Sequence, residues 1–114
     1  MTATDYINLR AARADLIARV AERTAPFDAL LMPTVAIIAP PISAFERDED
    51  YRHLNALLLR NPSVINFLDR CAITIPIQRA GTAPVGLMVV GEHGADRRLL
   101  ALARGIEPAL AARE

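Results

Sequence analysis

The 114-residue sequence contains no lysine, no tryptophan and a single cysteine, Cys71. One cysteine excludes an intrachain disulfide and a cysteine zinc cluster, and it fits a reducing compartment. The 13 arginines balance 13 acidic residues, so the zero net charge indicates no cationic surface for nucleic acid or anionic lipid. No apolar run reaches the roughly 18 residues of a membrane span, and the N-terminus carries charges where a signal peptide needs its apolar region. We therefore expect a cytoplasmic protein that binds neither nucleic acid nor membrane.

The first part of the chain predicts one helix, one short strand and an irregular connection. Thr2 followed three positions later by Asp5 is typical of a capping box at a helix N-terminus. Pro26 cannot continue a helix, so this helix should end near Thr24. The helix should be amphipathic, because an apolar stripe runs along it through Leu9, Ala12, Leu16 and Val20, widened by Ile17 and Ala21. The apolar run 29–32, stopped by a proline, predicts a buried strand, and the proline-rich VAIIAPPISA after it predicts an extended connection.

The second part begins with the charged run SAFERDED and predicts three further helices. The apolar residues of the first are Tyr51, Leu54, Leu57 and Leu58. We expect this helix to end at Arg60, because Asn61 and Pro62 are typical of the cap and first position of a separate short helix. The short helix should turn Val64, Ile65 and Leu68 toward a core. The final helix should have Asp96 as its cap and be disrupted by Pro108. Its inward-facing residues are expected to be Leu99, Leu100, Ala103 and Ile106.

Two strands are predicted between these helices. The segment AITIPIQ alternates isoleucine with other residues, a period of two that indicates a strand. Pro76 has no N–H group, so its nitrogen should lie where no hydrogen-bond partner is needed. The turn GTAP then leads into residues 85–90, and residues 72–90 should therefore form an antiparallel hairpin. Residues 85–90 show no alternation, which is typical of a strand covered on both faces.

The predicted order is α, β, loop, α, α, β, β, α, an α/β arrangement of about three strands with covering helices. A strand covered on both faces belongs inside a layered sheet, and three strands are few for such a sheet. We therefore expect strand 85–90 to need neighbours that this chain does not contain. The isolated chain should be a homo-oligomer, in which the strands or the helix from Asp5 to Arg23 pack against a second copy.

Groups that could carry catalysis or bind a metal are sparse. Ser63, His53 and Asp69 supply the residue types of a hydrolase triad, but no nucleophile elbow surrounds the serine, so coincidence is the better account. The acidic run ERDED lacks the alternating ligands and central glycine of a calcium loop, and we interpret it as a helix start or linker. His93 is either a general base or, more simply, a turn residue between two glycines. Cys71 beside apolar residues predicts a buried, inert thiol.

A series of segments along the chain carries a family resemblance: FDALLMPT, a proline-rich connection, and AITIPIQRAGTAPVGLMVVGEHGADRRLLALA. The series resembles the C-terminal end of the amidase signature family, which includes bacterial amidases and the A subunit of the glutamyl-tRNA amidotransferase. The usual ending of that family has a D-x-L-x-x-P-T strand, a P-A-x-S-x-P strand and a G-L-P-V-G-L-Q strand, then a loop and a helix with paired leucines. Here the second strand reads AITIPI and the third reads TAPVGLMVVG.

The resemblance covers residues 5–107 and implies a fold larger than this chain. In the family these elements belong to one large α/β domain, whose mixed central sheet is covered by helices on both sides. Residues 1–114 would then be a single partial domain, the C-terminal portion of that larger one. Strand 85–90 would be uniformly apolar because it lies inside the large sheet.

The resemblance also implies an activity: hydrolysis of a carboxamide C–N bond through an acyl-enzyme, with no metal and no organic cofactor. The family uses two serines, one joined through a cis peptide, and a lysine base, with a Gly/Ser-rich segment around the nucleophile. This sequence has no lysine, its serines are Ser43 and Ser63 alone, and no two glycines are adjacent. A hydroxyl needs a base to take its proton, and arginine is too basic to serve. We therefore assign no catalytic, cofactor-binding or metal-binding residue and expect the chain to be inactive alone.

The sequence leaves two functions open. One is the C-terminal segment of an amidase-type hydrolase, whose partner is the N-terminal remainder of that enzyme. Its substrate-binding residues are unknown, and loops 33–41 and 61–66 are the candidates to line a pocket. The alternative is a non-catalytic α/β module that works by oligomerisation or by docking to a partner.

Overall fold

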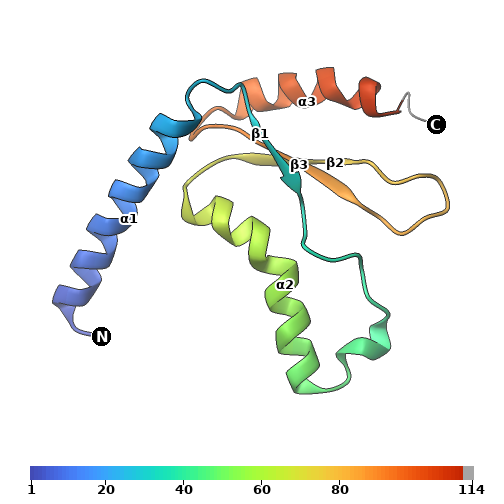
Figure 1. Cartoon of the computed structure of the whole chain (residues 1–114), viewed down its shortest axis with the longest axis horizontal. Helices are drawn as coiled ribbons and strands as arrows, with labels where there is room; N and C mark the ends of the chain where they lie inside the picture. Colours follow the sequence, from blue (N-terminus) through green and yellow to red (C-terminus); the bar gives the residue numbers. More distant parts are fainter. Residues whose placement is uncertain (112–114) are drawn as a thin grey trace.

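The protein is described by a computed structural model over residues 1–111. Within this range it is an α/β structure with a three-stranded antiparallel sheet and helices on both of its faces (Figure 1). The elements are α1 (Ala3–Thr24), β1 (Leu30–Pro33), the 3-10 helix η1 (Ile42–Phe45), α2 (Asp48–Phe67), β2 (Ala72–Pro76), β3 (Gly86–Val90) and α3 (Asp96–Ala111). The fold class and the strand order along the chain are as predicted, with one helix fewer than expected after the charged run.

The apolar strand β3 is the centre of the sheet, whose order is β1-β3-β2. Both neighbours run antiparallel to β3, and β2 pairs with it from Ala72 opposite Val90 to Pro76 opposite Gly86. The predicted hairpin over residues 72–90 is therefore confirmed. The expectation that β3 needs strands from outside the chain is wrong. The edge of β3 opposite β2 pairs with β1, although β1 lies much earlier in the sequence.

The core lies on the two faces of β3. On one face Val89, fully buried, packs with Ile75 of β2 and with Leu99 and Ala103 of α3. On the other face Met88 and Val90 pack with Ile65 of α2. Because successive side chains of a strand point to opposite faces, each face of β3 requires apolar residues of its own. This arrangement confirms that the strand is covered on both faces and explains its lack of alternation.

Helix α1 begins and ends where the sequence predicts. The Thr2 hydroxyl accepts a hydrogen bond from the Asp5 N–H at 3.1 Å, and the Asp5 carboxylate accepts one from the Thr2 N–H at 2.7 Å. Much of its apolar stripe is exposed. Leu9 and Leu16 are 60% and 40% exposed, and α1, described over its whole length, has no buried residue. The reason is its direction, since α1 extends away from the sheet (Figure 1).

Helix α2 is one helix that continues through Pro62, so the prediction of two helices meeting at Asn61 is wrong. The Asn61 side chain does not cap a new helix but donates to the Pro33 carbonyl of β1 at 2.8 Å. An interior proline removes one helical hydrogen bond and costs about 3 kcal/mol. Continuing the helix past Pro62 places Ile65 against Met88 and Val90, where it is almost fully buried. That burial offsets the cost of the proline.

Helix α3 covers the Val89 face of the sheet and differs from its prediction in three respects. Leu99 and Ala103 are buried and Ile106 packs beside them, but Leu100 is 59% exposed, because one helical step turns it about 100° from Leu99. Asp96 is the first helical residue rather than its cap. Pro108 does not end the helix, which runs to Ala111. In the described part of the chain no helix is long and apolar enough to span a membrane.

Candidate functional site

The triad considered from sequence is not assembled. Ser63 and His53 both lie on α2, and their separation of ten helical positions corresponds to about 15 Å along the axis. Asp69 lies beyond the end of α2, where its carboxylate pairs with Arg13. A nucleophile and base need to be within hydrogen-bond reach of each other, so these residues do not form a catalytic unit.

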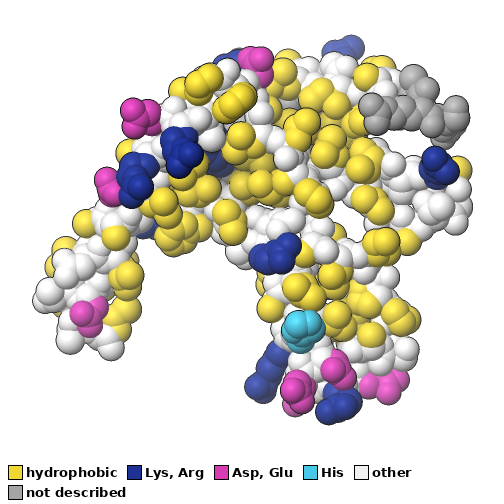
Figure 2. Space-filling view, viewed as in Figure 1, with side chains coloured by type: hydrophobic (Ala, Val, Ile, Leu, Met, Phe, Trp, Pro, Cys, Tyr) yellow, Lys and Arg dark blue, Asp and Glu magenta, His cyan; other side chains and the backbone are white. Residues whose placement is uncertain are grey.

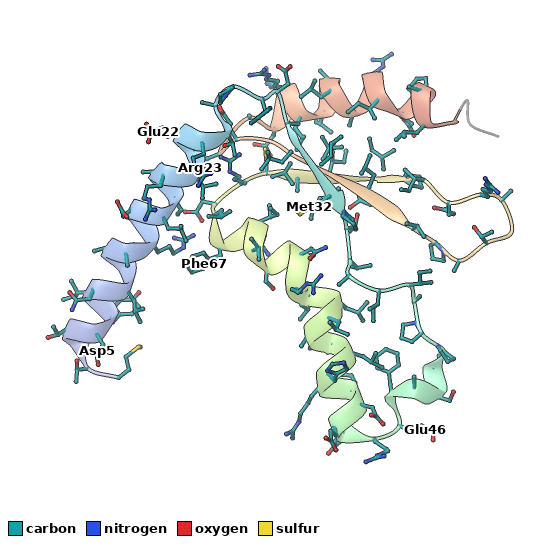
Figure 3. All side chains as sticks on the ribbon, viewed as in Figure 1. Asp5, Glu22, Arg23, Met32, Glu46 and Phe67 are labelled. Atoms are coloured by element: carbon teal, nitrogen blue, oxygen red, sulfur yellow. The ribbon has the colours of Figure 1, made fainter. Side chains whose placement is uncertain are left out.

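The polar contacts of the chain concentrate where α1 meets the end of α2. The Arg13 Nε donates to the Phe67 carbonyl at 2.8 Å, and the Arg13 Nη2 pairs with the Asp69 carboxylate at 2.5 Å. The guanidinium also lies over the Phe67 ring, 5.3 Å from its centroid; the ring points toward α1 in Figure 3. Sequence reasoning missed this contact, because Arg13 and Asp69 are far apart along the chain. Its role is to hold α1 to the end of α2.

His93 joins the same region from the loop that follows β3. Its Nδ1 lies 2.7 Å from the Asp69 carbonyl oxygen. A carbonyl only accepts hydrogen bonds, so the Nδ1 carries a proton in this contact. Asp69 itself has a φ of 53°, a left-handed conformation that asparagine and aspartate adopt more readily than most residues. The histidine is a turn residue, as the simpler interpretation had it, with the added task of fixing this turn.

A shallow hollow of about 420 Å³ opens beside these contacts. It is lined by Asn66, Asp69, Arg70, Cys71, His93, Gly94 and Asp96. The Cys71 thiol is half-buried and donates to the Glu92 carbonyl at 3.0 Å, so a structural hydrogen bond already uses it. Among the described residues no group of three or more His, Cys, Asp and Glu side chains could hold a metal ion. The hollow therefore offers polar contacts but lacks a paired nucleophile and base.

A second, apolar hollow of about 130 Å³ lies at the opposite end of the sheet. It is lined by Pro33, Val35, Ala36, Ile37, Ile38, Pro84, Val85 and Gly86. The hydrogen bond from Asn61 to Pro33 brings together the two segments that the sequence offered as pocket candidates, 33–41 and 61–66. The two segments therefore meet at this end of the sheet, although the hollow itself is lined only by residues of 33–38 and 84–86. The expectation that residues 61–66 form a loop is wrong, because they lie within α2.

Gly86, at the rim of the apolar hollow, is a residue whose role the sequence did not reveal. The hydroxyls of Thr34 and Thr74 are hydrogen-bonded at 3.0 Å, although the two threonines flank β3 from opposite sides. A Cβ on Gly86 would lie 2.4 Å from Thr74 Cγ2 and 2.7 Å from Thr34 Oγ1. Only glycine leaves room for the two threonines to meet across the strand. The signal was hidden because it depends on the strand register.

The Amidase family model matches residues 1–100. This chain belongs to the amidase family. It is 37% identical over 81 residues to the 2-amino-5-chloromuconic acid deaminase of Comamonas testosteroni, a match covering 70% of this chain and 18% of the deaminase. It is 29% identical over 110 residues to the fatty acid amide hydrolase of Medicago truncatula, covering 93% of this chain and 18% of the hydrolase.

A third relative, an uncharacterized protein in the nthA 5' region of Rhodococcus erythropolis, is 30% identical over 94 residues, 80% of this chain and 47% of that protein. The amidase-family chain thus spans less than half the length of these relatives. No solved structure matches it. The three segments that resemble the family form the strands β1, β2 and β3 of one sheet, and β3 is its central strand.

Proposed function

We propose that this amidase-family chain is the C-terminal segment of a hydrolase that cleaves carboxamide C–N bonds through an acyl-enzyme. The observation that carries the proposal is the match of the family model to residues 1–100. Two relatives named as a deaminase and an amide hydrolase support it. The sole cysteine, its thiol free, agrees with a cytoplasmic location.

The chain would contribute structure and pocket walls, while another part of the enzyme supplies the reacting groups. It has no lysine, and its serines are Ser43 and Ser63. A serine hydroxyl is a weak nucleophile without a base beside it, and the separation of Ser63 from His53 leaves it without one. The nucleophile and its base therefore come, in this proposal, from the N-terminal remainder of the amidase.

The exposed apolar face of α1 supports such a remainder as the partner. Figure 2 shows hydrophobic side chains along this helix and across the middle of the molecule. The large exposed ones on α1 are Tyr6, Ile7, Leu9 and Leu16. An amphipathic helix with much of its apolar stripe in solvent is unusual for a monomeric protein. In the proposed enzyme the remainder of the domain covers this stripe.

The apolar hollow gives the proposed enzyme a place for the acyl part of its substrate. The hollow is lined by aliphatic side chains and prolines of residues 33–38 and 84–86. Ligand pockets are mostly apolar with a few polar groups that fix orientation. In the enzyme, Ile37→Asp should raise KM for amides with apolar acyl groups, whereas Ile42→Asp, at a position 91% exposed, should leave KM unchanged. If both substitutions changed KM equally, the hollow would not be the binding site of the acyl group.

The deciding experiment concerns the reading frame upstream of Met1. The proposal expects an in-frame stretch that encodes a lysine and a Gly/Ser-rich segment. The extended protein should release ammonia from aliphatic or aryl amides, and the 114-residue chain alone should not exceed the buffer rate. An isolated short gene would support the non-catalytic module instead. If the short chain hydrolyses amides and the Ser63→Ala variant does not, the proposal that the nucleophile and base come from the N-terminal remainder is overturned. Hydrolysis that Ser63→Ala leaves unchanged would indicate a contaminating enzyme.

A further inference from the structure

The two outer edges of the sheet differ, and the edge formed by β1 is nearly closed. Thr34 donates its N–H to the Gly86 carbonyl at 2.9 Å. In an antiparallel pair the bonded positions alternate, so Leu31 and Pro33 direct their backbone groups away from β3. Pro33 has no N–H, and its carbonyl already accepts the hydrogen bond from Asn61. In the part of the chain that the structure describes, the outer edge of β1 is left with the backbone groups of Leu31.

The outer edge of β2 is open along the whole strand. The Cys71 carbonyl and the Ile77 N–H are hydrogen-bonded to the residues that flank β3, both at 2.9 Å. Because bonded positions alternate, Ala72, Thr74 and Pro76 direct their backbone groups outward. All three residues are exposed, and no backbone group of the described residues bonds to their outward groups.

The sequence of this edge does little to prevent pairing. Residues 71–78 include no charged side chain, and three of them are isoleucines, which favour strands. Natural proteins protect free edges with charges, bulges or a covering element. Within residues 71–78 the one such device is Pro76, at the end of the strand. The edge therefore has the character of an inner position of a larger sheet.

Helix α3 provides apolar cover on the side of this open edge. It packs more extensively on β2 than on β3. Ile73 of β2 and Ile106 and Leu110 of α3 pack against the core around Ile75, but they stay only partly buried. A helix layer over a sheet buries its apolar face against neighbouring strands. One further strand beside β2 would bury these partly covered side chains.

We infer that the outer edge of β2 receives a strand from the N-terminal remainder of the amidase, and that β1 is the terminal strand of the completed sheet. The inference rests on the proposed function, which supplies that remainder. The chain spans 18% of the deaminase and 18% of the amide hydrolase, so an enzyme of similar length has ample chain to provide the strand. A remainder in the same polypeptide has an effective concentration on the order of millimolar, which favours it over a second copy.

The edge specifies the chemistry of the strand that it accepts. Ala72 and Thr74 each offer an N–H and a C=O, whereas Pro76 offers a C=O alone. The incoming strand therefore pairs fully beside the first two residues and keeps one carbonyl without a donor beside the proline. Ile73 and Ile75 lie on the face that α3 covers. Side chains of adjacent strands interact on the same face of a sheet, so the incoming residues beside these isoleucines should be apolar.

Amide hydrogen exchange, resolved to single residues, tests the inference on the unmodified protein. In the extended protein the Ala72 and Thr74 amides should exchange at least about a hundredfold more slowly than in the 114-residue chain, because both become hydrogen-bonded. The Leu31 amide on the opposite edge is the matched control and should exchange rapidly in both proteins. Rapid exchange of Ala72 and Thr74 in the extended protein, or equal protection of Leu31, would overturn the inference.

The same measurement separates this inference from its alternatives. If Ala72 and Thr74 were already protected in the 114-residue chain, increasingly so at higher concentration, a second copy would be the partner and the inference would be wrong. An extended protein that hydrolyses amides but leaves Thr74 unprotected refutes this inference alone. One that protects Thr74 but hydrolyses no amide refutes the proposed activity alone. Absence of an upstream reading frame would remove the partner and so refute both.

A pair of proline substitutions in the extended protein gives a second test. Ala72→Pro removes an outward N–H, as Pro76 already does on the same strand, and leaves the bonds to β3 in place. It should speed exchange of the Thr74 amide about fivefold, the effect of one lost hydrogen bond. Leu31→Pro makes the same change on β1 and should leave that rate unchanged, and circular dichroism checks that both variants fold. Equal rates of Thr74 exchange in the two variants would contradict the inference.

Discussion

Replacing Gly86 with alanine tests the sheet register more directly than any other single change. The new Cβ would lie 2.4 Å from Thr74 Cγ2 and 2.7 Å from Thr34 Oγ1, both shorter than atoms can approach without a shift. The two obstacles come from the strands on either side of β3, so moving the alanine away from one pushes it toward the other. The hydroxyl contact between Thr34 and Thr74 cannot survive this displacement.

The size of the effect follows from three terms. Overpacking costs about 1–3 kcal/mol, and the lost hydroxyl hydrogen bond costs about 1 kcal/mol or less, since the threonines are partly exposed. Alanine returns about 0.5 kcal/mol by reducing the freedom of the unfolded chain. The net expectation for Gly86→Ala is a loss of about 2 kcal/mol in the free energy of unfolding.

Urea unfolding followed by circular dichroism measures this loss, and the other glycines supply matched controls. Gly105 lies inside α3, where a Cβ added to it would have nothing within 4 Å, so Gly105→Ala should gain about 1 kcal/mol. Thr74→Ser removes the methyl group that lies closest and keeps the hydroxyl, so it should recover part of the loss when combined with Gly86→Ala. If Gly86→Ala were as stable as Gly105→Ala, or if Thr74→Ser brought no recovery, the register of β1 and β2 on β3 would be refuted.

Two further predictions concern the core and the first helix. Val89→Ala removes two methyl carbons from the centre of the core and should cost about 2 kcal/mol in urea unfolding, whereas Leu100→Ala, at an exposed position, should cost almost nothing; equal losses would contradict the core assignment. Hydrogen bonds from the backbone and side chain of Thr2 hold the pKa of Asp5 below its usual 3.8, so the cap is fully present above the unfolded pKa and is lost as pH falls through the lower, folded one. The helicity of α1 should fall over that acidic range in the wild type, and the part due to the cap should be absent in Asp5→Asn.

Much of the fold could be predicted because some signals are local. The capping box of Thr2 and Asp5 and the proline at position 26 set the bounds of α1 within a few residues of sequence. Apolar residues alternate with other residues in β2 but not in β3, and this difference indicated that β3 is the strand covered on both faces. The turn between β2 and β3 allowed the hairpin to be predicted, because adjacent strands joined by a short loop pair antiparallel.

The remaining features depend on contacts between distant parts of the chain. Nothing near β1 says that it pairs with β3, far along the sequence, and so the second neighbour of β3 was sought outside the chain. The stripe on α1 predicts that a face needs cover but does not say what covers it. Pro62 has the local character of a helix start, and only the packing of Ile65 beneath β3 explains why α2 continues through it.

The candidate site shows the same division. Segments 33–41 and 61–66 could be nominated from the family resemblance, but the contact that joins them, between Asn61 and Pro33, depends on the tertiary structure. The role of Gly86 beneath the threonine pair could not be predicted from sequence either, because Thr34, Thr74 and Gly86 come together only in one strand register.

The two strand prolines unite these observations. The sequence required the nitrogen of Pro76 to lie where no partner is needed, and the register directs it away from β3. Pro33 occupies the equivalent outward position on β1. Neither proline therefore costs a hydrogen bond within the sheet, but each removes a donor from an outer edge. On β1 the Asn61 amide takes the remaining carbonyl of Pro33 and nearly closes the edge, whereas on β2 Ala72 and Thr74 keep both their groups free for a partner strand.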